Sequence, residues 1–513
     1  MNGGSIAAAW AVLPEYFGQH VLLSLSAILL GIVISLPLAI AAAHSRILRE
    51  PVLSIASIIQ TIPGLALLAL FYPILLAVSS VTMRAIGLRI PALGFLPALL
   101  ALTLYSMLPI LRNTIAGLTG VDPTVKTAAR AVGMTSWQLL WLVELPLAAP
   151  VIMAGIRIAA VWVIGTATLS TPVGQTSLGN YIFTGLQTEN WVFVLFGCVA
   201  AAVLAVVLDR LLALAESGFA NRSRSRVLTA FAGVLLVVLA GLYPLAGAAG
   251  RQAVIGAKNF DEQYTLSALI VDQLARAGIP ATRRSDLGST IIFRALATGD
   301  IDAYVDYSGT IWTNQMHRSD SPGRAEVLRQ TARWLKANYG ILDLGPLGFE
   351  NAYVLAMRSD RAKALGIRSL ADLALYAPRL KIGGDYEFFS RPEWSKVSNA
   401  YGINFLAQRS YQPTFMYRAL QDGDVDVIAA FSSDGRIAEY NLTLLSDPKS
   451  ALPPYDAILL VSPKRARDAK LTAALKPLVG RLNLSLMQRA NLMVDRDKRT
   501  PEEVAKWLAK NIR

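Results

Sequence analysis

Four aromatic residues recur at positions where the sequence predicts loops beside strands: Tyr307, Tyr353, Phe431 and Tyr455. The face of an aromatic ring carries negative π density, so it attracts a cation without needing a hydrogen-bond donor from it. Each desolvated contact of this kind contributes up to about 2 kcal/mol. Four inward-facing rings would therefore form a cage for a cation that has no N–H group, such as a quaternary ammonium.

Two similar segments, 295–310 and 419–435, predict how such rings are positioned. In each, a helix ends at a glycine, an aspartate-flanked strand follows, and a loop rich in Ser, Gly or Asp comes next. Open α/β sheets bind ligands at the carboxyl ends of their strands. From Val254 onward short strands alternate with helical stretches, which is typical of an α/β domain. We expect two lobes that close on a ligand by hinge motion, the first formed by 254–345 and 459–513 and the second by 346–458.

The rest of the chain has a different composition. Residues 1–250 contain 19 charged side chains, whereas residues 251–513 contain 64. This split predicts a membrane domain followed by a soluble one. The net charge of +13 is spread over both parts. No basic tract or aromatic-interleaved basic patch accompanies it, so we do not expect nucleic-acid binding.

Six apolar runs are long enough to cross a bilayer, which takes about 20 helical residues. Pro63 and Gly64 interrupt the second run and predict a kink or a break there. The amino terminus lacks the basic region of a cleavable signal, so we expect its first run to stay as an anchor. The runs are approximately 20–43, 52–79, 90–111, 147–170, 191–214 and 227–249.

Loop charges predict the orientation of these helices. With the amino terminus outside, the inner segments 44–51, 112–146 and 215–226 hold eight basic residues, against Arg84 and Arg89 outside. Cytoplasmic loops are enriched in basic residues. The soluble half is therefore expected on the extracytoplasmic side.

The long inner segment 112–146 predicts a compact pair of short helices. Asp122 can cap the first helix, Pro123 suits its first position, and Gly133 can end it. This segment resembles the cytoplasmic loop of ABC importer permeases, which carries E-A-A, then Gly, then Leu-Pro. The matching residues here are Thr127, Ala128, Ala129, Gly133, Leu145 and Pro146.

That resemblance implies a type I ABC importer permease whose loop docks on a cytoplasmic ATPase subunit. Thr127 replaces the usual glutamate, which affects one polar contact of the dock. The chain contains no G-x-x-x-x-G-K-[S/T] phosphate loop, so ATP and Mg²⁺ are expected on the partner. One cysteine and three histidines form no metal spacing, and no catalytic constellation stands out. We expect a transport component with no cofactor, metal or catalytic residue of its own.

The soluble half resembles the binding proteins of glycine betaine, carnitine and choline importers, which are type II periplasmic clamshells. Four stretches carry the resemblance: 255–263, 304–310, 348–353 and 431–436. It implies an aromatic cage at the four residues named above, with Phe431 where the family has tyrosine. It also implies a carboxylate-binding set, and three polar residues can support the site. The carboxylate set is Lys258, Thr310 and Arg391, and the supporting residues are Asn259, Glu262 and Asn351.

The predicted charges suggest which ligand fits. A guanidinium in the loop at Arg391 can give a carboxylate two parallel hydrogen bonds, and Lys258 adds a point charge. Two cations beside a cation cage predict a zwitterion such as glycine betaine, carnitine or proline betaine. Choline ranks lower because it would leave both cations unpaired, and ergothioneine fits if the pocket is roomy.

The predicted organisation is an all-α permease with about six helices over 1–226, including the coupling loop 112–146. An extra helix and linker follow over 227–250, and an α/β binding domain covers 251–513. The protein is expected to be a homodimer in a bacterial inner membrane, with an ATPase partner and a small zwitterionic ligand. A ligand-gated channel or sensor is the alternative, although the inner segments are short for an output domain.

Overall fold

The computed structural model describes most of the chain, and two compact units make it up. The helical unit comprises Ile6–Phe183 and Val192–Ala249. The α/β unit comprises Met1–Ser5, Thr184–Trp191 and Gly250–Arg513. Arg89 of the predicted outer loop and the linker 247–251 lie outside the described residues, which are 3–87, 90–188, 190–246, 252–318, 320–385 and 388–512.

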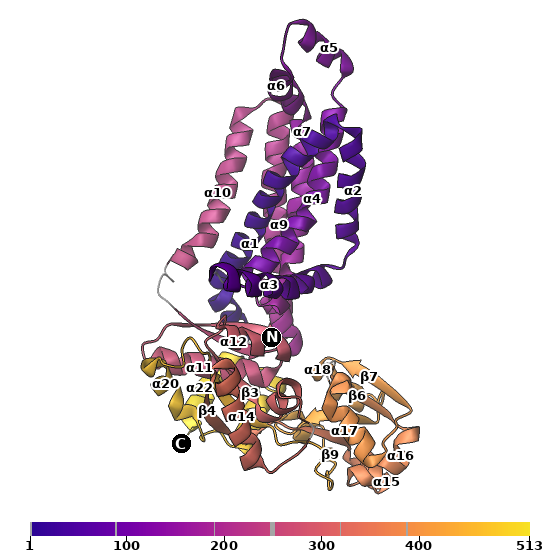
Figure 1. Ribbon diagram of the computed structural model, residues 1–513, viewed down its shortest axis with the longest axis vertical. Helices are drawn as coiled ribbons and strands as arrows, with labels where there is room; N and C mark the ends of the chain where they lie inside the picture. Colours follow the sequence, from indigo (N-terminus) through magenta and orange to yellow (C-terminus); the bar gives the residue numbers. More distant parts are fainter. Residues whose placement is uncertain are drawn as a thin grey trace. The chain divides into compact units, whose positions relative to one another are not determined.

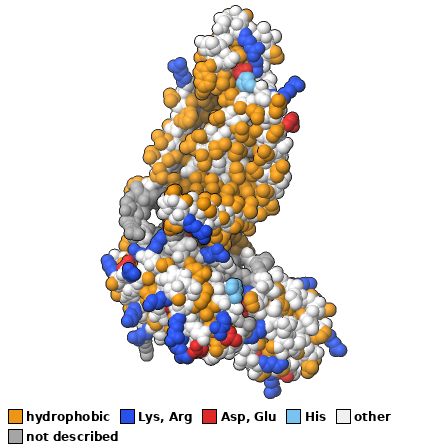
Figure 2. Space-filling view, in the orientation of Figure 1, with side chains coloured by type: hydrophobic (Ala, Val, Ile, Leu, Met, Phe, Trp, Pro, Cys, Tyr) orange, Lys and Arg blue, Asp and Glu red, His pale blue; other side chains and the backbone are white. Residues whose placement is uncertain are grey.

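The helical unit is built from long apolar helices (Figure 1). Within the described residues, six helical stretches are long and apolar enough to cross a membrane, as predicted. In Figure 2 hydrophobic side chains cover most of the visible surface of this unit. Its elements are α1 (Gly3–His44), α2 (Arg46–Thr61), α3 (Gly64–Ile86), α4 (Phe95–Thr119), α5 (Pro123–Ala131), α6 (Ser136–Leu139), η1 (Leu140–Glu144), α7 (Leu145–Ala167), η2 (Thr168–Val173), α8 (Gly179–Gln187), α9 (Trp191–Ala220) and α10 (Arg224–Ala246).

The second apolar run is divided where the sequence predicts a kink or break. Helix α2 ends at Thr61 and α3 begins at Gly64. Proline lacks the backbone N–H that a helix interior needs, so Pro63 starts a new helix instead of continuing the old one. The second spanning candidate therefore covers Gly64–Ile86, not 52–79, because α2 is a separate helix.

Close contacts and a partly exposed charge cluster hold the helical unit together. A Cβ at Gly155 of α7 would lie 2.5 Å from the Asn113 Cβ of α4, so only glycine permits this approach. Arg157 of α7 pairs through Nε with Asp209 at 2.7 Å and through Nη1 with Glu216 at 2.9 Å. These two acidic partners on α9 balance its charge within the apolar bundle.

The predicted pair of short helices is present in segment 112–146. The Asp122 carboxylate accepts a hydrogen bond from the Thr124 backbone N at 2.8 Å, and Pro123 opens α5. Gly133 has a φ of +84°, a conformation that glycine adopts at low cost. Thr135 then caps α6.

The α/β unit has two five-stranded sheets, and each sheet forms the core of one lobe (Figure 1). The first lobe has the strand order β2-β1-β3-β10-β4 and the second β7-β6-β8-β5-β9. The strands are β1 (Ala253–Lys258), β2 (Ala281–Leu287), β3 (Ala303–Tyr307), β4 (Leu342–Glu350), β5 (Tyr353–Arg358), β6 (Lys381–Asp385), β7 (Ala407–Tyr411), β8 (Val427–Phe431), β9 (Leu442–Leu444) and β10 (Asp456–Val461).

Helices α11 to α14 and α20 to α22 belong to the first lobe, and α15 to α19 to the second. Their bounds are α11 (Asp261–Arg276), α12 (Ser289–Thr298), α13 (Ser308–Thr310), η3 (Ile311–Gln315), α14 (Arg324–Tyr339), α15 (Ser359–Leu365), α16 (Leu370–Tyr376), η4 (Ala377–Arg379), η5 (Phe388–Ser390), α17 (Pro392–Tyr401), α18 (Pro413–Gln421), α19 (Arg436–Glu439), α20 (Ala469–Leu475), η6 (Lys476–Leu478), α21 (Leu484–Asp495) and α22 (Pro501–Asn511).

The two similar segments of the sequence occupy corresponding places in the lobes. Strand β3 lies inside the first sheet and β8 inside the second. A glycine with positive φ precedes each strand, Gly299 at +69° and Gly423 at +79°. Since β4 and β10 both lie wholly in the first sheet, the predicted lobe boundaries at 345/346 and 458/459 fall inside strands. The chain instead passes between lobes at 351–352 and before Asp456.

Candidate ligand-binding site

A cavity of about 80 Å³ lies between the two lobes and takes its walls from both. All four predicted cage residues line it, and so do the three predicted carboxylate-binding residues. Asn259 and Asn351 line it too, whereas Glu262 lies behind Tyr307. The lining residues are Lys258, Asn259, Phe260, Ser289, Tyr307, Thr310, Asn351, Tyr353, Asp385, Arg391, Pro413, Phe431 and Tyr455.

Strand ends bring the four predicted rings together. Tyr307 ends β3 and Phe431 ends β8, while Tyr353 begins β5 and Tyr455 directly precedes β10. Tyr353 and Phe431 are directly paired on neighbouring antiparallel strands, so their side chains share one face of the sheet. The ring centroids are 5.0 Å apart. The Tyr353 and Tyr455 rings meet edge to face, with centroids 6.1 Å apart.

A fifth ring completes the aromatic wall. Phe260 stacks on Phe431 with centroids 6.1 Å apart and planes 5° apart, and it lies 6.3 Å from the Tyr307 ring. The sequence did not single out Phe260. Its place two residues after Lys258, in the loop that follows β1, was the available signal.

Buried carboxylates hold the three tyrosine hydroxyls. The Tyr307 hydroxyl donates to Glu262 at 2.6 Å, the Tyr353 hydroxyl donates to Asp385 at 2.7 Å, and the Tyr455 hydroxyl donates to Glu393. Burial raises the pKa of Tyr307 and Tyr455 well above the usual value, and the neighbouring carboxylates raise it further. The phenols therefore stay protonated and their rings stay fixed.

Lys258 is paired within the protein. Its Nζ lies 2.6 Å from Asp306 Oδ1, and both side chains are almost fully buried. Asp306 also accepts hydrogen bonds from the Tyr304 hydroxyl and from the Tyr307 backbone N. The ammonium lies 5.2 Å from the centroid of the Tyr307 ring, which places it beside the cage.

Arg391 connects the lobes next to the rings. Its Nη2 donates to Ser289 Oγ of the first lobe at 3.3 Å, and Nη1 lies 3.6 Å from Glu393. Its guanidinium carbon lies 5.4 Å from the Tyr353 ring centroid. Each of the two cations thus has an acidic partner, contrary to our premise that they would be unpaired without a ligand carboxylate. Choline would therefore leave neither cation without an acidic partner.

Asp385 adds an acceptor to the cavity that the sequence did not single out. It ends β6, is 7% exposed, and accepts a hydrogen bond from the Phe388 backbone N at 2.7 Å. The rule that ligands bind at the carboxyl ends of strands applies to β6 as well as to β3 and β8. Applying it to every strand would have identified Asp385.

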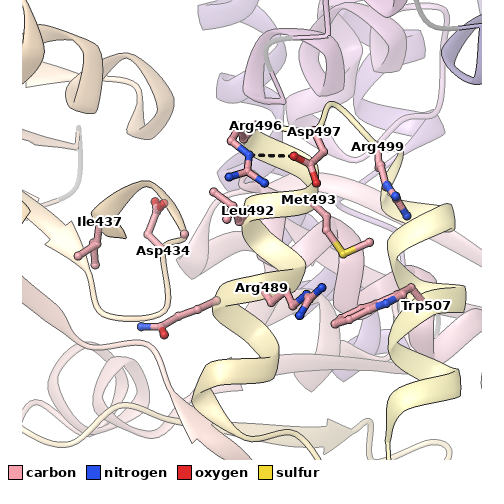
Figure 3. Close-up of a pocket in the computed structure, with 11 residues that line it drawn as sticks. Asp434, Ile437, Arg489, Leu492, Met493, Arg496, Asp497, Arg499 and Trp507 are labelled. Carbon is pink, nitrogen blue, oxygen red and sulfur yellow. Dashed lines mark hydrogen bonds and ion pairs between the residues drawn. The ribbon is translucent and has the colours of Figure 1, made fainter. Parts of the chain in front are cut away.

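A second cavity, of about 470 Å³, is larger but lies outside the cage. It is lined by residues of α21, α22 and the loop at 434–437 (Figure 3). Arg489 lies over the Trp507 ring in this cavity, 5.8 Å from its centroid. None of the predicted site residues lines it.

The predicted ATPase-docking residues lie in the short-helix segment. Thr127 and Ala128 are exposed on α5, whereas Ala129 is buried. The Thr127 hydroxyl donates to the Pro123 carbonyl at 2.9 Å, within its own helix. Exposed apolar side chains follow, with Val132 75% and Trp137 68% exposed. Leu145 and Pro146 begin α7.

Two family models together match most of the chain. Residues 28–221 match the binding-protein-dependent transport system inner membrane component, and residues 252–511 match the substrate binding domain of the ABC-type glycine betaine transport system.

The chain is also similar to individual proteins. It is 30% identical over 478 residues to the ergothioneine transport permease/ergothioneine binding protein EgtU of Helicobacter pylori strain G27, covering 89% of this chain and 83% of that protein. It is 39% identical over 199 residues to the glycine betaine/carnitine/choline transport system permease protein OpuCB of Bacillus subtilis strain 168, covering 39% of this chain and 84% of that protein. A solved structure titled glycine betaine/carnitine/choline ABC transporter is 28% identical, covers 50% of this chain and 98% of that one, and has a TM-score of 0.45.

Proposed function

Because the chain belongs to the family of glycine betaine, carnitine and choline ABC importers, as a membrane permease fused to its substrate-binding domain, we propose that it imports a zwitterionic quaternary amine. The observation that carries this proposal is the composition of the interlobe cavity. Five aromatic rings, Lys258 and Arg391 line one cavity.

The two ends of such a ligand match different parts of the cavity. A trimethylammonium group has no N–H to donate and is weakly hydrated, so ring faces bind it better than water does. Its carboxylate would lie among Lys258, Thr310 and Arg391. A guanidinium has five N–H donors, which is enough to bind a carboxylate while it also contacts Ser289 and Glu393.

Asp385 favours one member of this ligand class. Asp385 already accepts hydrogen bonds from the Tyr353 hydroxyl and the Phe388 backbone N. Glycine betaine and proline betaine have no N–H or O–H group, so they can add no hydrogen bond to it. The imidazole-2-thione ring of ergothioneine carries N–H groups that can donate to Asp385. The relative that matches this chain over 478 residues is an ergothioneine transport protein. We therefore place ergothioneine first and the smaller betaines and carnitine next.

In the proposed transport cycle, each part of this multi-pass membrane protein has its own role. The α/β domain lies on the extracytoplasmic side, captures the ligand by closing its lobes, and delivers it to the helices. A cytoplasmic ATPase subunit binds the exposed face of α5 and α6 and supplies ATP hydrolysis. Two copies of the chain form the pore. ATP and Mg²⁺ belong to the partner, since components of this family need no cofactor of their own.

Calorimetric titration of the detergent-solubilised full chain tests the ligand assignment. We expect ergothioneine, glycine betaine and carnitine to bind. Asp385→Asn should weaken ergothioneine about tenfold, because a charged acceptor is lost, and leave glycine betaine within about twofold. Failure of every quaternary amine to bind would refute the proposed function. Equal losses for ergothioneine and glycine betaine would refute the role of Asp385 alone.

A further inference from the structure

The lobes meet a second time beside the cavity, at the loop 432–436 that follows β8. Helix α21 of the first lobe faces this loop with Gln488, Asn491 and Asp495, which share one side of the helix. Gln488 donates to the Ser432 carbonyl at 3.0 Å, and Asn491 donates to the Ser433 carbonyl at 2.8 Å.

The approach of the loop to α21 is tight. A Cβ at Gly435 would lie 2.7 Å from the backbone N of Leu492, so the loop needs a glycine at this position. Asp434 and Leu492 face each other across this junction in Figure 3.

Arg436 supplies the charge at this contact. It is held within its own loop by two hydrogen bonds to Asp434, of 3.0 and 2.8 Å, and its Nε lies 3.5 Å from Asp495 of the first lobe. The guanidinium carbon also lies 4.4 Å from the Tyr417 ring centroid. Arg436, Asp434 and Asp495 are each more than 90% buried. A buried ion pair therefore crosses from one lobe to the other.

A second carboxyl group stands behind this ion pair. Asp261 begins α11, and burial raises the pKa of both Asp261 and Asp495. Arg436 faces Asp495 with its own partner Asp434 in place.

The contact is linked to the cage on both sides without lining the cavity. In the second lobe, the loop begins directly after the cage residue Phe431. In the first lobe, Asn491 also donates to Glu262 at 3.0 Å, and Glu262 holds the hydroxyl of Tyr307. Arg436, Gln488, Asn491 and Asp495 are absent from the walls of the 80 Å³ cavity.

We propose that Arg436, Gln488, Asn491 and Asp495 form an interlobe latch that holds the clamshell closed and sets ligand affinity without touching the ligand. The proposal rests on the proposed function in that ligand capture accompanies lobe closure. Because the latch residues do not line the 80 Å³ cavity, the latch stabilises the closed form equally for every ligand that binds there. Arg436 is thus a positioning residue for capture.

The first test compares Arg436→Met with the wild type in the full detergent-solubilised chain. We expect about tenfold weaker binding of ergothioneine, glycine betaine and choline alike, with most of the loss in a faster dissociation rate. Arg436→Lys, which keeps the charge, should recover part of the affinity. Asp495→Asn provides a second variant on the other lobe, and the double variant should lose less than the two single losses combined.

Arg489→Met is the matched control. Arg489 lies on the same helix, but it is exposed and directed at Trp507 (Figure 3), so its loss should leave affinity and dissociation rate within about twofold. Unchanged affinity in both Arg436→Met and Asp495→Asn would overturn the latch. A loss of ligand-free thermal stability with an unchanged dissociation rate would also overturn it, because that result indicates a structural role only.

Spin labels on the two lobes separate this proposal from the ligand assignment. Lys336 and Leu375 are exposed on α14 and α16, and each can be replaced by cysteine after Cys198→Ser removes the native thiol. Arg436→Met should shift the interlobe distances toward the open form even without ligand. If no amine binds the wild type but this shift occurs, the proposed function fails and the latch stands. Identical distance distributions would overturn the latch.

Discussion

Two arginines of the second lobe, Arg391 and Arg436, both contact the first lobe, but only Arg391 lines the ligand cavity. Each follows a strand of the second sheet, β6 or β8, and each is more than 90% buried. Arg391 lines the cavity and contacts Ser289, whereas Arg436 contacts Asp495 and is absent from the cavity wall.

The difference lies in what each arginine can contact. Asp434 accepts two hydrogen bonds from Arg436, of 3.0 and 2.8 Å, whereas Arg391 lines the ligand cavity. A guanidinium in the cavity wall can bind a ligand carboxylate directly, whereas Arg436 acts through its contact with Asp495. The free energy of lobe closure therefore has one contribution that depends on the ligand, from Arg391, and one that does not, from Arg436.

The largest effect should come from the ring on which Arg391 rests. Tyr353→Ala removes a cage wall and the hydroxyl that binds Asp385, so affinity for glycine betaine and ergothioneine should fall about 100-fold by calorimetry. Tyr353→Phe keeps the ring and should lose far less. A loss below about threefold in the alanine variant would remove Tyr353 from the cage.

Arg391→Ala should sharpen the comparison by discriminating between ligands. We expect glycine betaine to bind about 30-fold more weakly, since a charged hydrogen-bonding partner of its carboxylate is gone. Choline, which has no carboxylate, should change less than about threefold. Equal losses of affinity for the two ligands would indicate that Arg391, like Arg436, acts without binding the ligand carboxylate. The proposed difference between the two arginines would then be wrong.

Phe431→Tyr should have a small effect on affinity. The variant adds a hydroxyl while keeping the ring face, so ligand affinity should change by about twofold in either direction. Titration with glycine betaine and ergothioneine in parallel measures it. A change above tenfold would mean that the hydroxyl, and not the ring face, determines binding at this position.

Asp286 should affect stability and not affinity, because it lines neither the cavity nor the latch. Burial raises its pKa to about 7, above the usual 3.8. The folded state then binds a proton that the unfolded state releases, so the stability contribution is greatest below pH 4 and falls as the pH rises to 7. Asp286→Asn should remove that loss, on the order of 4 kcal/mol. Thermal unfolding of the full chain from pH 4 to 8 measures it, and an unchanged pH profile would contradict the assignment.

Local patterns in the sequence were sufficient for the architecture and for part of the site. Apolar runs predicted six spanning helices, and Pro63 marked the break between α2 and α3. The rings at the ends of β3 and β8 were found because strand ends and glycine turns are local signals. Asp385 and Phe260 also lie at or just after the ends of strands, so the same local signals could have predicted them.

The ion-pair partners of the charged residues could not be predicted from the sequence. Lys258 meets Asp306 only because β1 and β3 are neighbours in the sheet. Arg436 meets Asp495 because α21 packs back against the second lobe, 59 positions further along the chain. Such pairings depend on the folded arrangement of distant elements, and no spacing in the chain predicts them.

The most direct test of the central claim compares ligands that differ only in three methyl groups. Glycine betaine and glycine share the same carboxylate and carbon chain, as do ergothioneine and its unmethylated amino acid. Titrated into the full chain, each methylated ligand should bind at least about 100-fold more tightly, because only a quaternary ammonium enters the aromatic cage without losing N–H hydrogen bonds to water. Equal affinity for methylated and unmethylated ligands would contradict the account.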